Sequence, residues 1–131
     1  ETDSGKKVLL VEDNELNSEI AKEIISMTGA QVETAENGKM AVDHMLSRPA
    51  GYYDMIFMDI QMPVMNGYEA TKAIRSIDDG RGCNIPIIAM TANAFAEDII
   101  KAKKAGMNEH MAKPIDINKL YEVLRHWLVN D

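Results

Sequence analysis

Short apolar segments of the sequence end in polar side chains that could take part in chemistry. The segments read VLLV, MIFM, IPIIAM and EHMA, and the residues that follow them are Glu12, Asp13, Asp59, Thr91 and Lys113. If these segments are parallel strands of one sheet, their carboxyl ends share one edge, where ligands of such folds bind. Three carboxylates, one hydroxyl and one ammonium group are then expected to converge at that edge.

The carboxylates themselves point to a metal ion. Glu12, Asp13 and Asp59 would repel one another if packed together, which raises their pKa values unless a cation shares the site. A ligand set made only of oxygen atoms, without a Cys or a nearby His motif, favours Mg²⁺ or Mn²⁺ over zinc. We therefore expect a divalent metal beside these three residues.

The apolar segments suit strands that are buried on both faces of a parallel sheet. The weaker segment QVETAE alternates in polarity, and stretches of helical periodicity lie between the strands. The helix positions expected to face the core are Asn17, Ala21, Ile24 and Thr28, then Ala41, Val42, Met45 and Leu46, then Ala70, Ala73, Ile74 and Ile77, and finally Leu120, Val123, Leu124 and Trp127. Five strands alternating with five helices predict a doubly wound α/β fold.

Local signals mark where the helices begin and end. Asn14, Asn66 and Asp116 are interpreted as caps, because Asn and Asp accept hydrogen bonds from the free amides of a first helical turn. Gly29 is a natural stop for the first helix. The NGK sequence at 37–39 lacks the preceding glycines of a nucleotide-binding loop and predicts a helix start.

Length and charge narrow the class of protein. A chain of 131 residues suits one domain, here expected over residues 7–131 after a linker at 1–6. A formal charge of −7 argues against nucleic acid as a partner. The single Cys83 cannot form an internal disulfide, and no apolar run approaches the roughly 20 residues that span a bilayer. We expect a cytoplasmic domain without membrane contact of its own, which could be a piece of a longer, membrane-anchored protein.

The segments VLLVEDN, MDIQMPVMNGYEA, IIAMTANA and AGMNEHMAKP occur in an order and spacing that resemble the receiver domain of two-component response regulators. The resemblance covers about the whole chain. It implies a five-stranded parallel sheet in the order 2-1-3-4-5, which is the flavodoxin-like, CheY-like arrangement.

The resemblance also implies a role for each site residue. Asp59 would accept a phosphoryl group from a histidine kinase or a histidine phosphotransfer domain. Mg²⁺ would be bound by Asp13, Asp59 and the backbone carbonyl of Gln61, with Glu12 acting mostly through water. Thr91 and Lys113 would contact the phosphoryl oxygens, so that the domain catalyses its own phosphorylation and dephosphorylation.

Activation would then depend on Thr91, whose hydroxyl moves toward the phosphoryl group and draws the following loop with it. By resemblance, the Lys113–Pro114 peptide bond is cis. The chain departs from the family at His110, where a Tyr or Phe that moves inward is usual. We therefore expect an altered coupling between Thr91 and the family's output face, which the fourth helix, fifth strand and fifth helix build.

The wording of the motifs is most similar to receivers of hybrid histidine kinases, which pass phosphate to a histidine phosphotransfer domain. Leu16 and Ile20 on the first helix form an exposed stripe that could dock a histidine-bearing helix. Gln61 and Asn93, two residues after Asp59 and Thr91, are uncharged amides, and we expect slow loss of the phosphate. A weak homodimer is a further partner that the resemblance allows.

Other classes remain as alternatives. A stand-alone response regulator acting by protein contact would have the same sequence features. A haloacid-dehalogenase-type phosphatase also uses an Asp nucleophile, but it requires a second acid where this chain has Gln61. A flavodoxin-like electron carrier would need a loop rich in Ser, Thr and Gly where this chain reads EDNELN, which would repel a phosphate.

Overall fold

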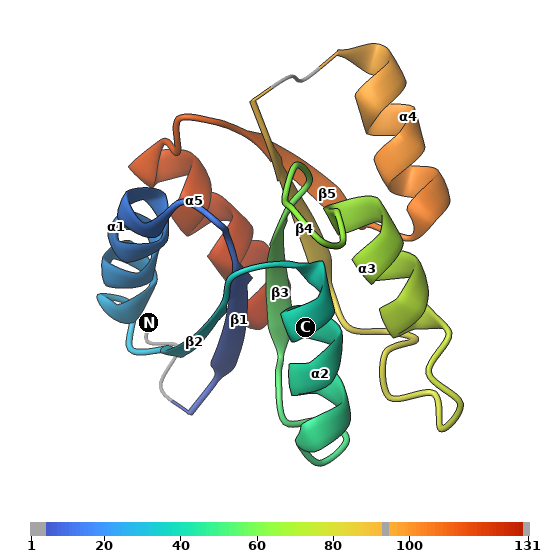
Figure 1. The fold of residues 1–131 in the computed structure, drawn as a ribbon. Helices are drawn as coiled ribbons and strands as arrows, with labels where there is room; N and C mark the ends of the chain where they lie inside the picture. Colours follow the sequence, from blue (N-terminus) through green and yellow to red (C-terminus); the bar gives the residue numbers. More distant parts are fainter. Residues whose placement is uncertain (1–4, 93–94, 130–131) are drawn as a thin grey trace.

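The computed structural model describes residues 5–92 and 95–129, and Figure 1 shows their arrangement. The sheet consists of β1 (Lys7–Val11), β2 (Gln31–Ala35), β3 (Met55–Asp59), β4 (Ile87–Thr91) and β5 (Glu109–Ala112). All neighbouring strands are parallel and their order is β2-β1-β3-β4-β5, as predicted. No helix within the described residues is long and apolar enough to cross a membrane.

Helices cover both faces of the sheet (Figure 1). They are α1 (Glu15–Ser26), α2 (Gly38–Ser47), α3 (Gly67–Arg75), α4 (Ala96–Ala105) and α5 (Ile117–Leu124), and a π-helical turn, Arg125–Val129, follows α5. The first and last helices pack on one face, and the other three lie on the opposite face. The predicted doubly wound α/β fold is confirmed.

Two apolar clusters sandwich the sheet because successive strand residues point to opposite faces. In β1, Leu9 faces the cluster under α2 and α3, whereas Leu10 faces the cluster under α1 and α5. Every residue of β3 and β4 is buried, which explains why these segments are apolar throughout. The polar Asp59 and Thr91 at their ends are therefore exceptions that need a chemical reason.

The predicted caps are confirmed. Asn14 and Asn66 accept hydrogen bonds from Asn17 and Glu69, and Asp116 accepts one from Asn118. Asn37 caps α2, so the NGK sequence begins a helix as expected.

Two helix positions that were expected in the core are exposed. Asn17 lies in the first turn of α1, where the helix passes beyond the sheet edge, and the buried face begins at Ala21. Leu46 is 54% exposed because it is rotated by about 100° from the buried Met45. The prediction was also two residues early for β4, which starts at Ile87; Pro86 has no N–H for the ladder.

Candidate functional site

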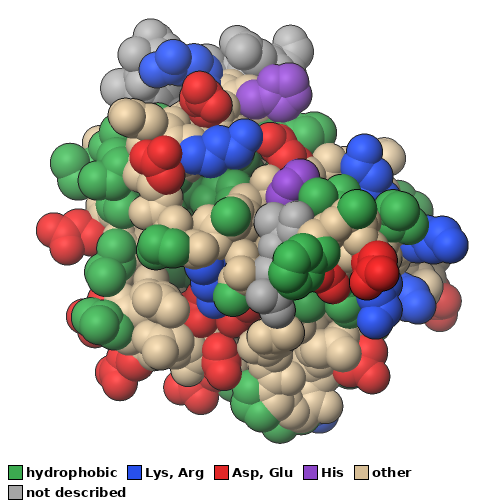
Figure 2. Space-filling model, turned by 90° about the horizontal axis from the view of Figure 1, so that it is seen from above, with side chains coloured by type: hydrophobic (Ala, Val, Ile, Leu, Met, Phe, Trp, Pro, Cys, Tyr) green, Lys and Arg blue, Asp and Glu red, His purple; other side chains and the backbone are tan. Residues whose placement is uncertain are grey.

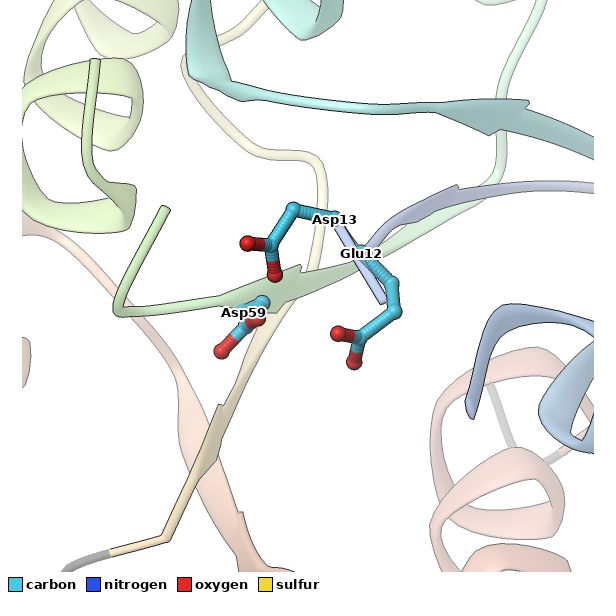
Figure 3. Close-up of side chains that lie close together, drawn as sticks. All are labelled: Glu12, Asp13 and Asp59. Atoms are coloured by element: carbon cyan, nitrogen blue, oxygen red, sulfur yellow. The ribbon is translucent and has the colours of Figure 1, made fainter. Parts of the chain in front are cut away.

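The site lies at the carboxyl ends of the central strands, where the sequence placed it. Glu12 and Asp13 follow β1 directly, and Asp59 is the last residue of β3. One carboxylate oxygen from each of the three residues lies within 4.8 Å of the others. Figure 3 shows the three side chains around a common space. Glu12 and Asp59 are buried and Asp13 is exposed, so the cluster opens to solvent on the Asp13 side.

Lys113 brings a positive charge to two of these carboxylates. Its Nζ lies 2.9 Å from Oε1 of Glu12 and 3.2 Å from Oδ2 of Asp59. The other oxygen of Glu12 accepts a hydrogen bond from the amide of Asn14, at 3.1 Å. Glu12 is therefore held on both sides, and the Lys113 ammonium is shared between the carboxylates that end neighbouring strands.

The electrostatic balance at Asp59 favours proton uptake in the absence of a metal. Burial and the charge of Glu12 raise the pKa of Asp59 to about 7, although the Lys113 ammonium opposes this rise. Burial alone would lower the pKa of Lys113, but its hydrogen bonds and attraction to Glu12 and Asp59 raise it instead. A further cation in the site would therefore stabilise the ionised form of Asp59, and Lys113 stays protonated.

Thr91 is the buried last residue of β4, beside the β5 residue Ala112 in the sheet. Its carbonyl oxygen accepts a hydrogen bond of 2.9 Å from the Lys113 amide. Asp59 pairs with Met90, the residue before Thr91, so Thr91 ends the strand next to Asp59, and Lys113 follows β5, the next strand beyond β4. The five residues predicted to converge therefore lie at one edge of the sheet.

The loop after β3 is shaped for close approach to Asp59. The Gln61 amide donates to Oδ1 of Asp59 at 3.4 Å, and its side chain is exposed. A Cβ at Gly67 would lie 2.4 Å from the backbone oxygen of Asp59, so only glycine fits there. Val64 has a φ of 71° and is 77% exposed, an unusual conformation for a β-branched residue. Asn93, the second amide predicted to influence phosphate loss, lies outside the described residues.

Comparison with known proteins identifies the family to which this chain belongs. The family model for the response regulator receiver domain matches residues 8–125. The chain belongs to the response regulator receiver family. This membership decides against the phosphatase and electron-carrier alternatives.

Relatives of this receiver include hybrid kinases. The chain is 42% identical over 121 residues to hybrid signal transduction histidine kinase I of Dictyostelium discoideum, covering 91% of this chain and 7% of that protein. It is 34% identical to sensor histidine kinase GacS of Pseudomonas protegens, with 92% of this chain and 13% of that protein covered. The receiver spans only 7% to 16% of the length of eight curated relatives that it matches, these two included.

Solved structures share the fold and the site region. The receiver domain of sensor histidine kinase PA1611 from Pseudomonas aeruginosa, with magnesium coordinated in its active-site cleft, matches with a TM-score of 0.85 and 37% identity over 95% of this chain and 98% of that one. The Saccharomyces cerevisiae Ssk1 receiver, crystallised with the phosphotransfer protein Ypd1, matches with a TM-score of 0.84 and 31% identity over 94% and 88% of the chains. That PA1611 receiver holds magnesium in its cleft, and this receiver has the acidic cluster of Glu12, Asp13 and Asp59.

His110 lies on β5 beneath α4. It is half-buried and pairs with Ala89 in the sheet. Its side chain lines a cavity of about 10 Å³ together with Ile99, Ala102 and Met107. The imidazole therefore sits between β5 and α4.

Two apolar side chains of α1 are exposed. Leu16 is 68% exposed and Ile20 is 47% exposed, as the sequence predicted for this stripe. Ile20 also lines a groove of about 390 Å³ that reaches Lys113, and the other lining residues are Glu12, Asn17, Ala92, Pro114 and Ile115. In the view of Figure 2, apolar side chains gather on this part of the surface beside acidic ones.

The sequence interpretation missed part of this groove. Asn17 was assigned to the core, and Pro114 was given only a geometric role, which the cis Lys113–Pro114 bond confirms. Ile115 received no role. Its apolar side chain directly after the KP pair is the signal that could have found it. In the structure it is partly buried against the cluster under α1 and α5 and lines the groove.

Proposed function

We propose that Asp59 is the phosphoacceptor of this receiver and takes its phosphoryl group from a phosphohistidine. A carboxylate oxygen of Asp59 attacks the phosphorus atom while the P–N bond breaks, and the imidazole leaves with that electron pair and takes a proton from water. The observation that carries the proposal is the buried Asp59 carboxylate within 3.2 Å of the Lys113 ammonium. Lys113 neutralises negative charge on the equatorial oxygens of the transferred group and helps to hold the attacking oxygen and the leaving nitrogen in line.

Asp13, Asp59 and the Gln61 carbonyl are proposed to hold Mg²⁺ directly, with Glu12 acting through water and Mn²⁺ as a substitute. The donor set fits, because carboxylate oxygens from Glu12, Asp13 and Asp59 lie within 4.8 Å of one another and Asp13 opens to solvent. When bound, the metal screens the phosphoryl oxygens and favours the ionised form of Asp59. The role of the chain itself is to orient the nucleophile and to keep Lys113 protonated.

Thr91 is proposed to report the phosphorylated state. Its position at the end of β4, joined through its carbonyl to the Lys113 amide, allows its hydroxyl to turn toward the phosphoryl oxygens and draw the loop with it. His110 beneath α4 occupies the place of the usual inward-moving aromatic residue. Because an imidazole is smaller, we expect it to couple Thr91 to the output face less strongly.

The partner is proposed to be a histidine kinase or a histidine phosphotransfer domain that docks on Leu16 and Ile20. The names of the relatives support a receiver at residues 7–131 of a hybrid kinase that relays phosphate onward. The Ssk1 receiver in complex with Ypd1 supports the phosphotransfer partner. A cytoplasmic location is part of the proposal, and it also allows a parent protein that is anchored in a membrane. The alternative is a stand-alone response regulator, and the flanking sequence would distinguish it from the receiver of a hybrid kinase.

Intact mass spectrometry tests the proposed chemistry. Wild type, Asp59→Asn and the exposed control Asp43→Asn are incubated with acetyl phosphate, with and without Mg²⁺. We expect one Mg²⁺-dependent phosphoryl group in wild type and Asp43→Asn and none in Asp59→Asn. Uptake by Asp59→Asn, or none by wild type, would contradict the assignment.

The decay of the phosphorylated protein tests the relay role. Gln61 carries an exposed, uncharged amide that does not activate water as an acid or base would. We therefore expect Asp59 phosphate to persist long enough to be passed to a phosphotransfer domain. A half-life of a few seconds would argue against the relay and favour a short-lived signal.

A further inference from the structure

The loop between β3 and α3 is fixed at its two ends by backbone hydrogen bonds. The Ile60 amide donates to the Met90 carbonyl of β4 at 3.1 Å, and the Ile60 carbonyl accepts from the Gly67 amide at 2.9 Å. Three of the residues between these two points are exposed: Gln61, Pro63 and Val64. The position of residues 61–66 therefore depends on contacts within the loop and with the neighbouring helix.

The middle of this loop meets the first residue of α2. The Gly38 amide donates a hydrogen bond of 3.0 Å to the Met65 carbonyl. Gly38 opens α2, and since the first amides of a helix have no acceptor within it, this bond satisfies one of them. Figure 1 shows α2 beside α3 on the same face of the sheet, so the loop that leads into α3 passes the start of α2.

The contact leaves no room for a side chain at position 38. A Cβ on Gly38 would lie 2.5 Å from the Met65 backbone oxygen and 2.9 Å from Cβ of Ala70 in α3. Neither atom is the end of a flexible side chain, so an added methyl group would have to displace backbone. Ala41 of α2 and Ala70 of α3 are completely buried, whereas much of the loop is exposed. The loop is therefore the part that would move.

A displacement of this loop bears on the metal site because Gln61 lies in it. The Gln61 carbonyl is the proposed backbone ligand of Mg²⁺ beside Asp13 and Asp59. The Gln61 amide lies 3.4 Å from Oδ1 of Asp59, which is a long hydrogen bond and holds Gln61 only weakly. Because Mg²⁺ requires near-ideal octahedral geometry, a small shift of one ligand lowers its affinity.

We propose that Gly38 is a positioning residue for the metal site, because the absence of a side chain there lets α2 fix the β3–α3 loop. The proposal rests on the proposed binding of Mg²⁺ by Asp13, Asp59 and the Gln61 carbonyl. Gly38 itself contacts neither the metal nor the phosphoryl group. It holds the Met65 carbonyl and thereby determines where the Gln61 carbonyl lies relative to Asp59.

The Mg²⁺ affinity of Gly38→Ala tests this role. Titration calorimetry of the whole chain gives the dissociation constant, at a temperature at which circular dichroism shows each variant to be folded. Gly51→Ala is the matched control: Gly51 has a φ of 81° and nothing within 4 Å of its Cβ position, so alanine strains the backbone there without touching the loop. We expect Mg²⁺ to bind at least roughly tenfold more weakly to Gly38→Ala, as is usual when a residue that orients a metal ligand is changed. Gly51→Ala should bind like wild type.

Amide hydrogen exchange of wild type gives a second measurement, which a merely structural role of Gly38 would not affect. Coupling between two sites is reciprocal. If the bond from Gly38 to Met65 favours Mg²⁺ binding, saturating Mg²⁺ must therefore slow exchange of the Gly38 amide by a similar factor. The Arg48 amide, which donates to the His44 carbonyl at the other end of α2, should exchange at the same rate with and without Mg²⁺.

An unchanged dissociation constant in folded Gly38→Ala, or equal weakening in Gly51→Ala, would overturn the proposal. Equal slowing of exchange at Gly38 and Arg48 would also overturn it, because it would indicate a general stabilisation by the metal. Should Gly38→Ala not fold, the exchange of wild type decides, and no slowing at Gly38 would overturn the role of this residue. If wild type bound no Mg²⁺, the proposed metal site itself would fail, whereas binding by wild type with an unchanged constant in Gly38→Ala would remove only the role of Gly38.

Discussion

The Lys113 ammonium lies 3.2 Å from Oδ2 of Asp59, although the two residues are 54 positions apart in the chain. They meet because β3 and β5 flank β4 in a parallel sheet and end at the same edge. Lys113 also contacts Glu12 at 2.9 Å. One cation thus balances two carboxylates, which leaves the site short of positive charge.

The variant Lys113→Met should take up phosphate from acetyl phosphate far more slowly than wild type. The loss is expected to be on the order of 100-fold, because a positioned donor to the transferring oxygens disappears. In addition, Lys113 lowers the pKa of Asp59, so less of the nucleophile would be ionised at neutral pH. Mass spectrometry over time gives the rate, with Lys72→Met as the control. Uptake at the wild-type rate would show that Lys113 is not part of the machinery.

The raised pKa of Asp59 predicts an unusual pH dependence of stability without metal. The folded protein keeps Asp59 protonated up to about pH 7, whereas the ordinary value is 3.8. The folded state therefore binds more protons between these values, and this contribution is fully present below about pH 3.8 and is lost as the pH rises through about 7. The variant Asp59→Asn has no carboxyl group at this position that could ionise.

Thermal unfolding should therefore show Asp59→Asn gaining stability over wild type as the pH rises from about 5 to 8. Over this pH range the gain is at most about 3 kcal/mol, because about two pH units separate pH 5 from the raised pKa of about 7, and it is less where Glu12 and Lys113 adjust. Added Mg²⁺ should reduce the difference, because it stabilises the ionised carboxylate. A difference that does not change with pH, while Asp43→Asn stays at the wild-type value, would refute the raised pKa.

The sequence predicted the edge of the sheet well because strand ends carry a strong local signal. Asp59 and Thr91 stand out as polar residues directly after apolar runs, and a parallel sheet necessarily places such residues together. The helix faces were harder to predict, since a short helix offers several neighbouring stripes. Asn17 and Leu46 each fit the period but lie beyond or beside the buried stripe.

Contacts that depend on loops could not be read from periodicity. Arg75 meets Gly106 across 31 positions, and its acceptors are mostly backbone carbonyls, which every residue carries. Glu33 appears in sequence as one residue of a weakly alternating strand. In the structure it is the centre of a polar network with Arg48 and two tyrosines, because α2 returns its carboxyl end to the edge strand.

Glu33 should stabilise the fold through this polar network. Burial alone would raise its pKa, but hydrogen bonds from Tyr53, Tyr52 and Arg48 lower it to about 2. These donors lie 2.6, 2.7 and 3.0 Å from its oxygens. The stabilisation is therefore present above about pH 4.5 and is lost as the pH falls through about 2.

We expect Glu33→Gln to lower the free energy of unfolding by about 1–2 kcal/mol at neutral pH, since charge-assisted hydrogen bonds become neutral ones. The difference from wild type should shrink on acidification. Urea unfolding measures it, with the exposed Glu23→Gln as the control, and phosphate uptake should stay unchanged. Equal stability of Glu33→Gln and wild type at neutral pH would mean that the network contributes nothing net.

The exposed stripe of α1, Leu16 and Ile20, should contribute to binding of a protein phosphodonor and should not affect phosphorylation by acetyl phosphate. Leu16 is 68% exposed, and Met27, at the far end of the same helix, is 71% exposed. Replacing each by Ser removes a similar apolar surface, but only Leu16 lies one helical turn before Ile20, which lines the groove that reaches Lys113. We therefore expect Leu16→Ser to weaken binding to a histidine phosphotransfer domain by about tenfold, as loss of a partly buried contact predicts.

Met27→Ser should bind like wild type, and acetyl phosphate should modify both variants at the wild-type rate. Titration calorimetry gives the affinities. Equal weakening by both substitutions would indicate general damage to α1, and no weakening by Leu16→Ser would move the docking surface away from this stripe.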